Sequence, residues 1–208
     1  GRFELSTEPR IINQEIQRLS STIRARLDAE QRLKNAGEYA IPFMLDALAD
    51  EGRKMEFSNI TAAIPKIGRD AIRPLAAALQ TPNVAVRAEI IRALGKIQYP
   101  QSLGYLKLIV EQDPSPQLQE LARQAIGQID TQSLQLPAAE LFFVLAEKYY
   151  NHAESVAPNA EYSFANIWFW DQEAGRLRRE EVNPAYFYEL MAMRCCEWAL
   201  KADPNTGK

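Results

Sequence analysis

An internal repeat with a period of about 31 residues limits this chain to a small set of folds. The stretch from Ala40 to Leu48 and the stretch from Ala71 to Leu79 are separated by this period, and both begin with Ala-Ile and end with Leu. A looser third copy begins at Leu103, one further period after Ile72. Such short units cannot bury an apolar face alone, so the period predicts repeats that stack on their neighbours.

A second element follows each copy and has the apolar spacing of a helix. Thr81–Arg87 leads into Arg92–Ile97, and the same pattern returns one period later, where Asp113–Gln119 leads into Gln124–Ile129. The first copy, residues 63–67, is more divergent. Because apolar residues recur three and four apart, each repeat is predicted to be two helices with one buried face each.

Two Pro-containing pairs are predicted helix starts. Thr81 or Asp113 would cap the second helix of its repeat, and Pro82 or Pro114 would occupy the first turn, where no backbone N–H is needed. Gly95 and Gly127 fall near the predicted helix ends.

These stretches resemble the short bacterial HEAT-repeat family. The first helices have the pattern Ala-Ile-Pro-x-x-Leu, and the second have Asp-Pro-x-x-x-x-Arg followed by Ala-Leu-Gly-x-Ile, over roughly residues 37–130. The resemblance implies an all-α fold, an α-α superhelix of helical hairpins. Arg87 stands at the family's usual Arg position, which commonly braces the inter-repeat turn. Gln119 replaces it in the third copy, so we expect weaker bracing there.

Residues 1–36 are predicted to form an N-terminal capping segment built on one long helix from Pro9 to Asn35. Its apolar residues share one stripe, with spacings of four, three, four and four. The alternative is a dimerising or partner-binding helix. The residues of the stripe are Ile12, Ile16, Leu19, Ile23 and Leu27.

Residues 137–208 have a different pattern, which resembles a tetratricopeptide helical pair. Its first helix would be Ala139–His152, and its second would lie near the end of the chain, before Ala-Leu-x-x-Asp-Pro-Asn. Because another repeat would begin there, we expect the natural protein to continue past Lys208. The residues that carry the resemblance are Phe142, Leu145, Ala146, Tyr149, Ala192, Cys196, Ala199 and Pro204.

A long insertion separates these two helices, where the family has a few residues. It contains the β-prone run Ile167–Trp170, the turn-like Asp171–Gly175 and a loosely alternating Leu177–Val182. We therefore predict a small β-hairpin near residues 165–183.

Composition lowers the expectation of nucleic-acid binding. The 208 residues carry a net charge of −3, whereas nucleic-acid binders usually have a strongly basic domain or stripe. No apolar run approaches the ~18 residues of a membrane-spanning helix. The start of the chain, Gly1–Ser6, has no signal-peptide features, so the sequence leaves the compartment open.

No constellation of residues predicts catalysis, a cofactor or a metal site. His152 is the only histidine, and His152-Ala153-Glu154 matches the His-x-Glu of zinc deaminases without the Cys-x-x-Cys that they need. Cys195 and Cys196 are adjacent, which is unfavourable for a disulfide, and at least one is expected to be buried on a helix.

The leading hypothesis is a non-catalytic protein–protein interaction or scaffold module whose partner is a protein or peptide. Trp168 and Trp170 share one strand face, which either packs on the helices or forms an exposed binding patch. The polar candidates lie on the second helix of the middle repeat. They are Arg87, Glu89, Arg92 and Lys96.

Two other classes remain open. HEAT-like DNA glycosylases suggest nucleic-acid binding, with stacking on Trp168, Trp170 and Asp171. The arginines for such a site would be Arg69, Arg73, Arg87 and Arg92. Phycobiliprotein lyases also carry short HEAT-like repeats, which suggests a bilin-lyase-like enzyme on the repeat alone.

Overall fold

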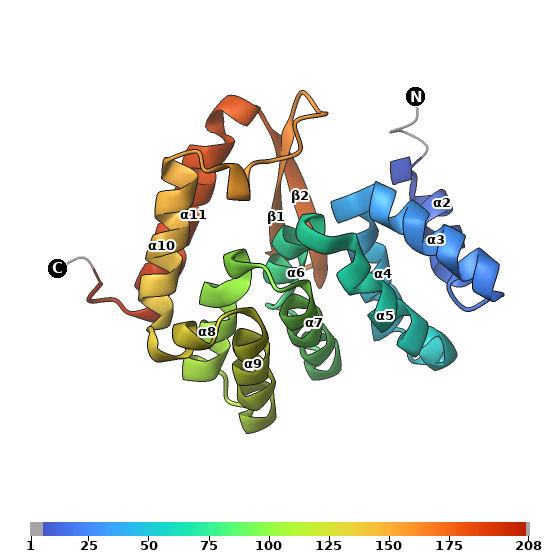
Figure 1. Cartoon of the computed structure of the whole chain (residues 1–208), viewed down its shortest axis with the longest axis horizontal. Helices are drawn as coiled ribbons and strands as arrows, with labels where there is room; N and C mark the ends of the chain where they lie inside the picture. The colour runs from blue at the N-terminus through green and yellow to red at the C-terminus, as the bar shows by residue number, and fades with distance from the viewer. Residues whose placement is uncertain (1–5, 207–208) are drawn as a thin grey trace. The chain divides into compact units, whose positions relative to one another are not determined.

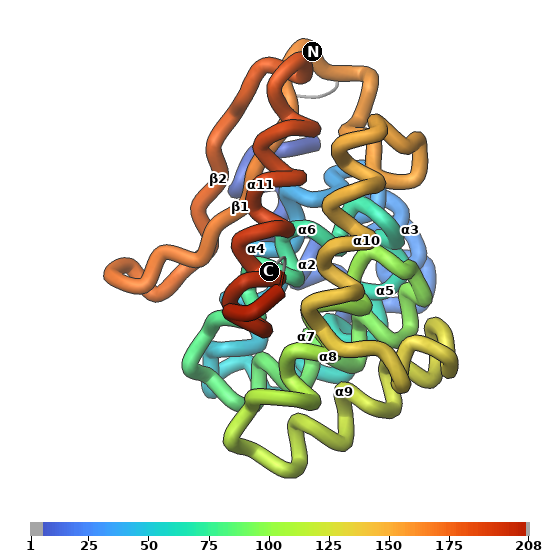
Figure 2. Tube along the Cα trace, turned by 90° about the vertical axis from the view of Figure 1, so that its left-hand side faces the viewer, coloured from blue at the N-terminus to red at the C-terminus, as the bar shows by residue number. Residues whose placement is uncertain are grey.

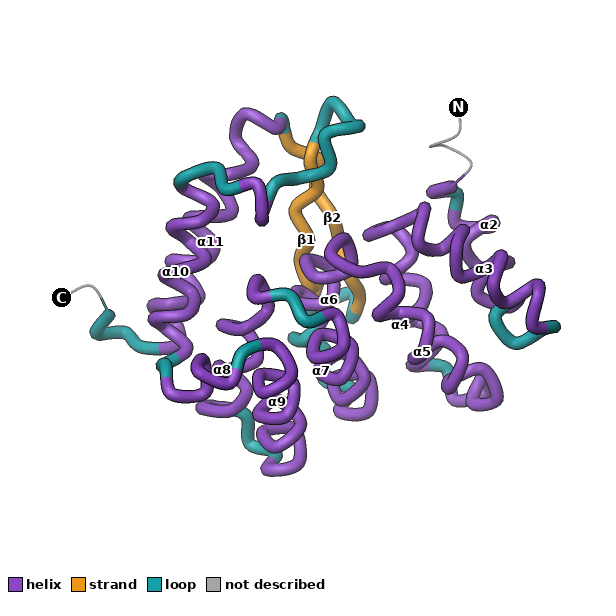
Figure 3. The backbone as a smooth tube through the Cα atoms, in the orientation of Figure 1, coloured by secondary structure: helices purple, strands orange, loops and turns teal. Residues whose placement is uncertain are grey.

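A computed structural model describes residues 6–206 of the chain (Figure 1), and nearly all of its regular structure is helical (Figure 3). The contacts divide the chain into two compact units. The first contains Gly1–Ile97 and Trp170–Leu177, and the second contains Gln98–Phe169 and Arg178–Lys208. The predicted all-α fold with HEAT-like helical hairpins and a small β-hairpin is confirmed.

Helices of the first unit pack in two layers. The second helices of successive repeats, α3, α5 and α7, lie side by side, while α4 and α6 form the other layer (Figure 1). Short 3-10 turns join the pairs, and the side chains between the layers are aliphatic, as the repeat pattern predicts. The helices are α2 (Pro9–Arg18), α3 (Ile23–Ala36), α4 (Ile41–Ala49), α5 (Phe57–Ile67), α6 (Ile72–Ala78) and α7 (Val84–Ile97).

The prediction of one long N-terminal helix is wrong, because the first helix ends at Arg18 and a second helix begins after Thr22. Thr22 begins α3, and its Oγ1 accepts a hydrogen bond from the Ala25 backbone N–H at 3.2 Å. The three consecutive hydroxyl residues 20–22 favour a cap over a helix interior. The stripe breaks with the helix: Ile23 and Leu27 are 73% and 60% exposed, whereas the earlier three residues are buried.

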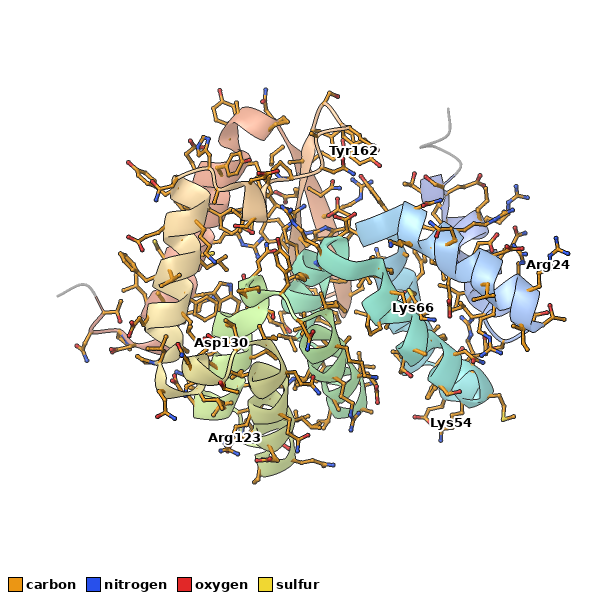
Figure 4. All side chains as sticks on the ribbon, in the orientation of Figure 1. Arg24, Lys54, Lys66, Arg123, Asp130 and Tyr162 are labelled. Carbon is orange, nitrogen blue, oxygen red and sulfur yellow. The ribbon has the colours of Figure 1, made fainter. Side chains whose placement is uncertain are left out.

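The resulting α2–α3 pair repeats the arrangement of the later pairs. Helix α2 packs on α3 and on α4, and α3 packs on α5. The buried Glu15 carboxylate joins the two helices, since it accepts hydrogen bonds from Arg18 Nη1 at 2.8 Å and Arg32 Nη1 at 3.1 Å. Between α3 and α5, Lys66 Nζ lies 2.7 Å from Glu30 Oε1 (Lys66 is labelled in Figure 4).

Predicted helix starts at Thr81 and Asp113 lie two residues too early. Asn83 Oδ1 accepts from the Val86 N–H at 3.1 Å, and Ser115 Oγ accepts from the Leu118 N–H at 3.3 Å. Pro82 and Pro114 therefore lie in the turn that precedes each helix, not in its first turn. Thr81 and Asp113 instead accept hydrogen bonds from the backbone N–H two residues on, and so shape that turn.

The second unit places the third repeat against the C-terminal helical pair. Helix α8 packs on α9 and on α10, and α10 runs antiparallel to α11 (Figures 1 and 2). Strands β1 and β2 form the predicted hairpin. The elements are α8 (Leu103–Gln112), α9 (Pro116–Ile129), α10 (Ala138–Tyr150), β1 (Ala165–Asp171), β2 (Arg176–Val182) and α11 (Pro184–Ala202).

Aromatic side chains fill the core between α8, α10 and α11. The Phe142 ring meets the Tyr105 ring edge-on at 4.9 Å and stacks with the Trp198 ring at 6.0 Å. A buried hydrogen bond of 2.7 Å runs from Gln101 Nε2 to the Tyr149 hydroxyl. The third repeat is thus packed on the helical pair, although the predicted segments 37–130 and 137–208 separate the two in sequence. Those segments, with residues 1–36, stay predictions as domain boundaries.

Candidate interaction surfaces

Three of the four polar candidates on α7 share one side of the helix. Glu89, Arg92 and Lys96 are three and four residues apart, which places them in one row. Arg92 and Lys96 are exposed, and Arg92 Nη1 lies 2.6 Å from Glu89 Oε1. Arg87 is half-buried and lies two residues before Glu89, so it points to a different side. The structure therefore offers a small mixed-charge row in which Glu89 and Arg92 form an ion pair and Lys96 adds a second cation at the end.

Gln119, which replaces the family's Arg in the third repeat, still braces its turn. Its Nε2 donates to the Asp113 backbone carbonyl at 2.7 Å. A neutral amide thus holds the turn that precedes α9 by one direct hydrogen bond.

The aromatic hairpin is more buried than a binding patch would be. Trp168 is only 4% exposed, and Trp170 is half-buried on the same strand face. On the other face, Ile167 and Phe169 pack into the core formed with α10 and α11. Arg194 of α11 fixes the strand, since its Nη1 donates to the Trp168 carbonyl at 2.7 Å and its guanidinium lies 4.4 Å above the Phe169 ring. This burial favours the interpretation that the hairpin aromatics pack on helices.

Two of the four arginines proposed for a nucleic-acid surface, Arg73 and Arg92, are paired with carboxylates. Arg73 is largely buried, and its Nη2 lies 3.7 Å from Glu38 Oε2. Arg92 is paired with Glu89. These contacts reduce the net positive charge that phosphate binding requires.

The residues that could carry chemistry are separated or inert. Burial raises the pKa of the Cys195 thiol to about 12, so it is protonated at neutral pH and is a poor nucleophile. The burial of Cys195 agrees with the expectation that at least one of the two is buried, and Cys196 is exposed. His152 stacks on Tyr188 at 4.2 Å, and its Nε2 lies 3.4 Å from Glu189 Oε1. Within residues 6–206, no group of three His, Cys, Asp or Glu side chains comes together in a way that could hold a metal ion.

Sequence reasoning missed one surface, an apolar groove between α10 and α11 with a volume of about 590 Å³. Of the eight residues that carry the tetratricopeptide resemblance, six are buried, and Cys196 and Pro204 are exposed. The signal for the outer face was the spacing of large apolar residues at 143, 150, 193 and 200. The groove is lined by Phe143, Ala146, Glu147, Tyr150, Ala192, Met193, Cys196, Glu197 and Leu200.

Comparison with known families supports the class that the fold defines, a helical-repeat protein. Residues 41–127 match the family model of HEAT repeats, which supports a HEAT-like repeat protein. HEAT repeats generally mediate protein–protein interaction or scaffolding, and the family is typically non-enzymatic. A search of curated protein sequences found no match. Bacterial origin and the tetratricopeptide likeness of α10 and α11 stay predictions.

In the part of the chain that the structure describes, each helix is too short or too polar to cross a membrane.

Proposed function

We propose that this chain is a non-catalytic interaction or scaffold module that binds a protein or peptide. The observation that carries the proposal is the stack of HEAT-like helical pairs, whose second helices α3, α5 and α7 form a continuous layer in the first unit. A layer of parallel helices presents rows of side chains over a larger area than one helix could, which is how repeat proteins bind extended partners.

The polar row on α7 is the part of this layer that we assign to partner contact. Glu89, Arg92 and Lys96 are held on a well-packed helix, since Ile90, Ile91 and Leu94 anchor its other sides in the core. A partner that carries both charges could pair with this row. Exposed pairs of this kind contribute little affinity each, about 0–1 kcal/mol, and mainly set orientation and specificity.

The test is capture of a protein partner from lysate of the source organism by the whole chain and by two double variants. Arg92→Ala/Lys96→Ala removes the cations of the row. Arg24→Ala/Lys54→Ala removes one Arg and one Lys from exposed positions on α3 and near the start of α5, which Figure 4 labels. We expect specific capture by the natural chain and the control, and weaker capture by the α7 variant.

Absence of any specific protein partner would contradict the proposal, and salt-dependent binding of DNA would move the protein to the nucleic-acid class. Equal capture by all three chains would remove the α7 row from the site. Trp168→Ala is a less useful probe because Trp168 is buried, so its loss would also disturb the hairpin.

A further inference from the structure

The outer face of the α10–α11 pair is apolar over two helical turns on each helix. Four large side chains in the groove lining face solvent: Tyr150 is 74% exposed, Met193 61%, and Phe143 and Leu200 51% each. They stand seven residues apart on each helix, 143 with 150 and 193 with 200, so each pair lies in one row along its helix. Contiguous exposed apolar surface on a folded protein marks an interaction site for another protein, a ligand or a membrane, and the charges and dimensions of this groove favour a protein.

The charges in the groove have one sign. Its lining contains two carboxylates, Glu147 and Glu197, and no basic residue. Within residues 6–206, neither carboxylate has a hydrogen bond or an ion pair. The basic residues of α11 are engaged elsewhere, Arg194 over the Phe169 ring and Lys201 over the Trp198 ring. A partner that covers the groove must therefore bring cations to Glu147 and Glu197, or leave both carboxylates uncompensated near an apolar contact.

The dimensions fit a short helix. Residues 143–150 and 193–200 each span about 10 Å of helix, at about 1.5 Å per residue. A helix of two to three turns has this length, and its residues at i, i+3, i+4 and i+7 would enter the groove. Lys or Arg on either side of that stripe would then lie beside Glu147 and Glu197.

A second copy of this chain fits less well. If two grooves met face to face, four carboxylates from Glu147 and Glu197 would be brought into one apolar interface with no base among the lining residues. Like charges brought together in this way oppose association.

Resting on the proposed interaction function, we infer that the α10–α11 groove is a docking site for a short amphipathic helix of a protein partner, with Lys or Arg flanking its apolar stripe. The groove and the α7 row lie in different parts of the sequence and in different compact units. The chain thus holds two surfaces for protein, one of mixed charge and one apolar with an acidic border.

The first experiment measures binding of two labelled peptides of about 15 residues to the whole chain by fluorescence anisotropy. Both carry Leu at i, i+3, i+4 and i+7. One has Lys at the flanking positions and the other has Glu. We expect the Lys peptide to bind at least about tenfold more tightly, a difference that two unpaired carboxylates in the groove are sufficient to produce.

Two pairs of variants locate the site. Met193→Glu adds a carboxylate to the groove, and Met55→Glu makes the same change at a residue of the first unit that is 92% exposed. We expect only Met193→Glu to weaken binding of the Lys peptide, by about tenfold or more. Glu147→Lys/Glu197→Lys is expected to transfer the preference to the Glu peptide. Glu161→Lys/Glu173→Lys changes the net charge equally at exposed positions outside the groove and is expected to leave the preference unchanged.

Cys196 gives an independent readout of where the peptide lies. It lines the groove and is exposed, while the adjacent Cys195 is buried. Bound Lys peptide is expected to slow alkylation of Cys196 in the natural chain. Because all of the altered side chains are exposed, we expect every variant to fold, and circular dichroism checks this.

Several outcomes overturn the inference. These are failure of the Lys peptide to bind, equal binding of the Glu peptide, and binding that Met193→Glu leaves unchanged. Dimerisation of the natural chain that Met193→Glu abolishes would assign the groove to a second copy. Each of these leaves the proposed function standing if the natural chain still captures a protein through α7, whereas loss of all specific capture is what contradicts the proposed function.

Discussion

At Gly68 the backbone has φ of +79° and ψ of −142°, a conformation that is essentially open to glycine alone. Gly37 has nearly the same angles, +58° and −130°, and lies one repeat period earlier, at the end of α3. The two glycines end the second helix of successive pairs and begin the 3-10 turn to the next. The same glycine turn thus recurs from one pair to the next. Because Gly37 follows α3, the repeat also includes the α2–α3 pair.

Replacing Gly68 with Ala is expected to destabilise the protein through backbone strain. A Cβ at Gly68 would meet no atom within 4 Å, so crowding contributes nothing and strain of about 1–3 kcal/mol remains. Gly127 is the matched control, because it lies inside α9 with equally open space. Gly127→Ala should stabilise by about 0.5–1 kcal/mol. Urea denaturation measures both, and a Gly68→Ala variant as stable as the natural chain would contradict the argument.

Gly104 is required for a different reason, close approach of an aromatic ring. A Cβ there would lie 2.9 Å from Phe142 Cδ1. Since Phe142 packs between the Tyr105 and Trp198 rings, it has little room to move. Gly104→Ala is therefore expected to cost about 1–3 kcal/mol by overpacking. In a double-mutant cycle with Phe142→Leu, the cost of the alanine should fall, and strictly additive effects in urea denaturation would argue against this contact.

At the scale of elements, the sequence predicted the repeated helices and hairpin well and the helix starts poorly. Periodic apolar residues identify α4 to α9 because burial of one face is what stabilises them. The starts depend on local hydrogen bonds, in which Asn83 and Ser115 competed with the better-known Thr-Pro and Asp-Pro signals. The stripe over residues 12–27 continued across a break that only the hydroxyl cap at Thr22 revealed.

The candidate sites were harder to predict than the elements. The sequence placed Arg87, Glu89, Arg92 and Lys96 on one helix, and the structure separates half-buried Arg87 from the other three, which share one side. The sequence could not show that Trp168 is buried. A strand places alternate residues on its two faces, and the local sequence does not say which face lies in the core. The groove between α10 and α11 joins helices that a long insertion separates in sequence, so only their packing makes it visible.

The cap of α9 gives a prediction at this scale. Ser115→Ala removes the side-chain acceptor for the Leu118 N–H and is expected to cost about 1 kcal/mol. Ser115→Asp keeps an acceptor and adds a negative charge at the helix N-terminus, so it should restore most of the stability. Thermal unfolding of the three proteins checks this. If Asp is no better than Ala, Ser115 does not stabilise the helix through its cap.

For the whole molecule, the repeat pattern and the contacts divide the chain differently. The third repeat belongs by sequence with the first two, yet α8 packs on α10, and Glu111 Oε1 accepts from the Ala138 N–H at 3.0 Å at the start of α10. Gln112 Nε2 also donates to the Ala202 carbonyl at 3.0 Å. These contacts bind residues across the predicted boundary between 130 and 137 into one unit.

If the contact units are also units of stability, mutations in one should open that unit alone. Gly68→Ala lies in the first unit and Gly104→Ala in the second. Native-state hydrogen exchange should then show faster exchange of the protected amides of α5 and α7 in the first variant, with those of α10 and α11 unchanged, and the reverse in the second. A fall in protection that is the same in every helix for both variants would mean that the repeats and the helical pair unfold as one cooperative block. The α7 row and the α10–α11 groove would then be lost together on partial unfolding, whereas separate units let either surface persist while the other opens.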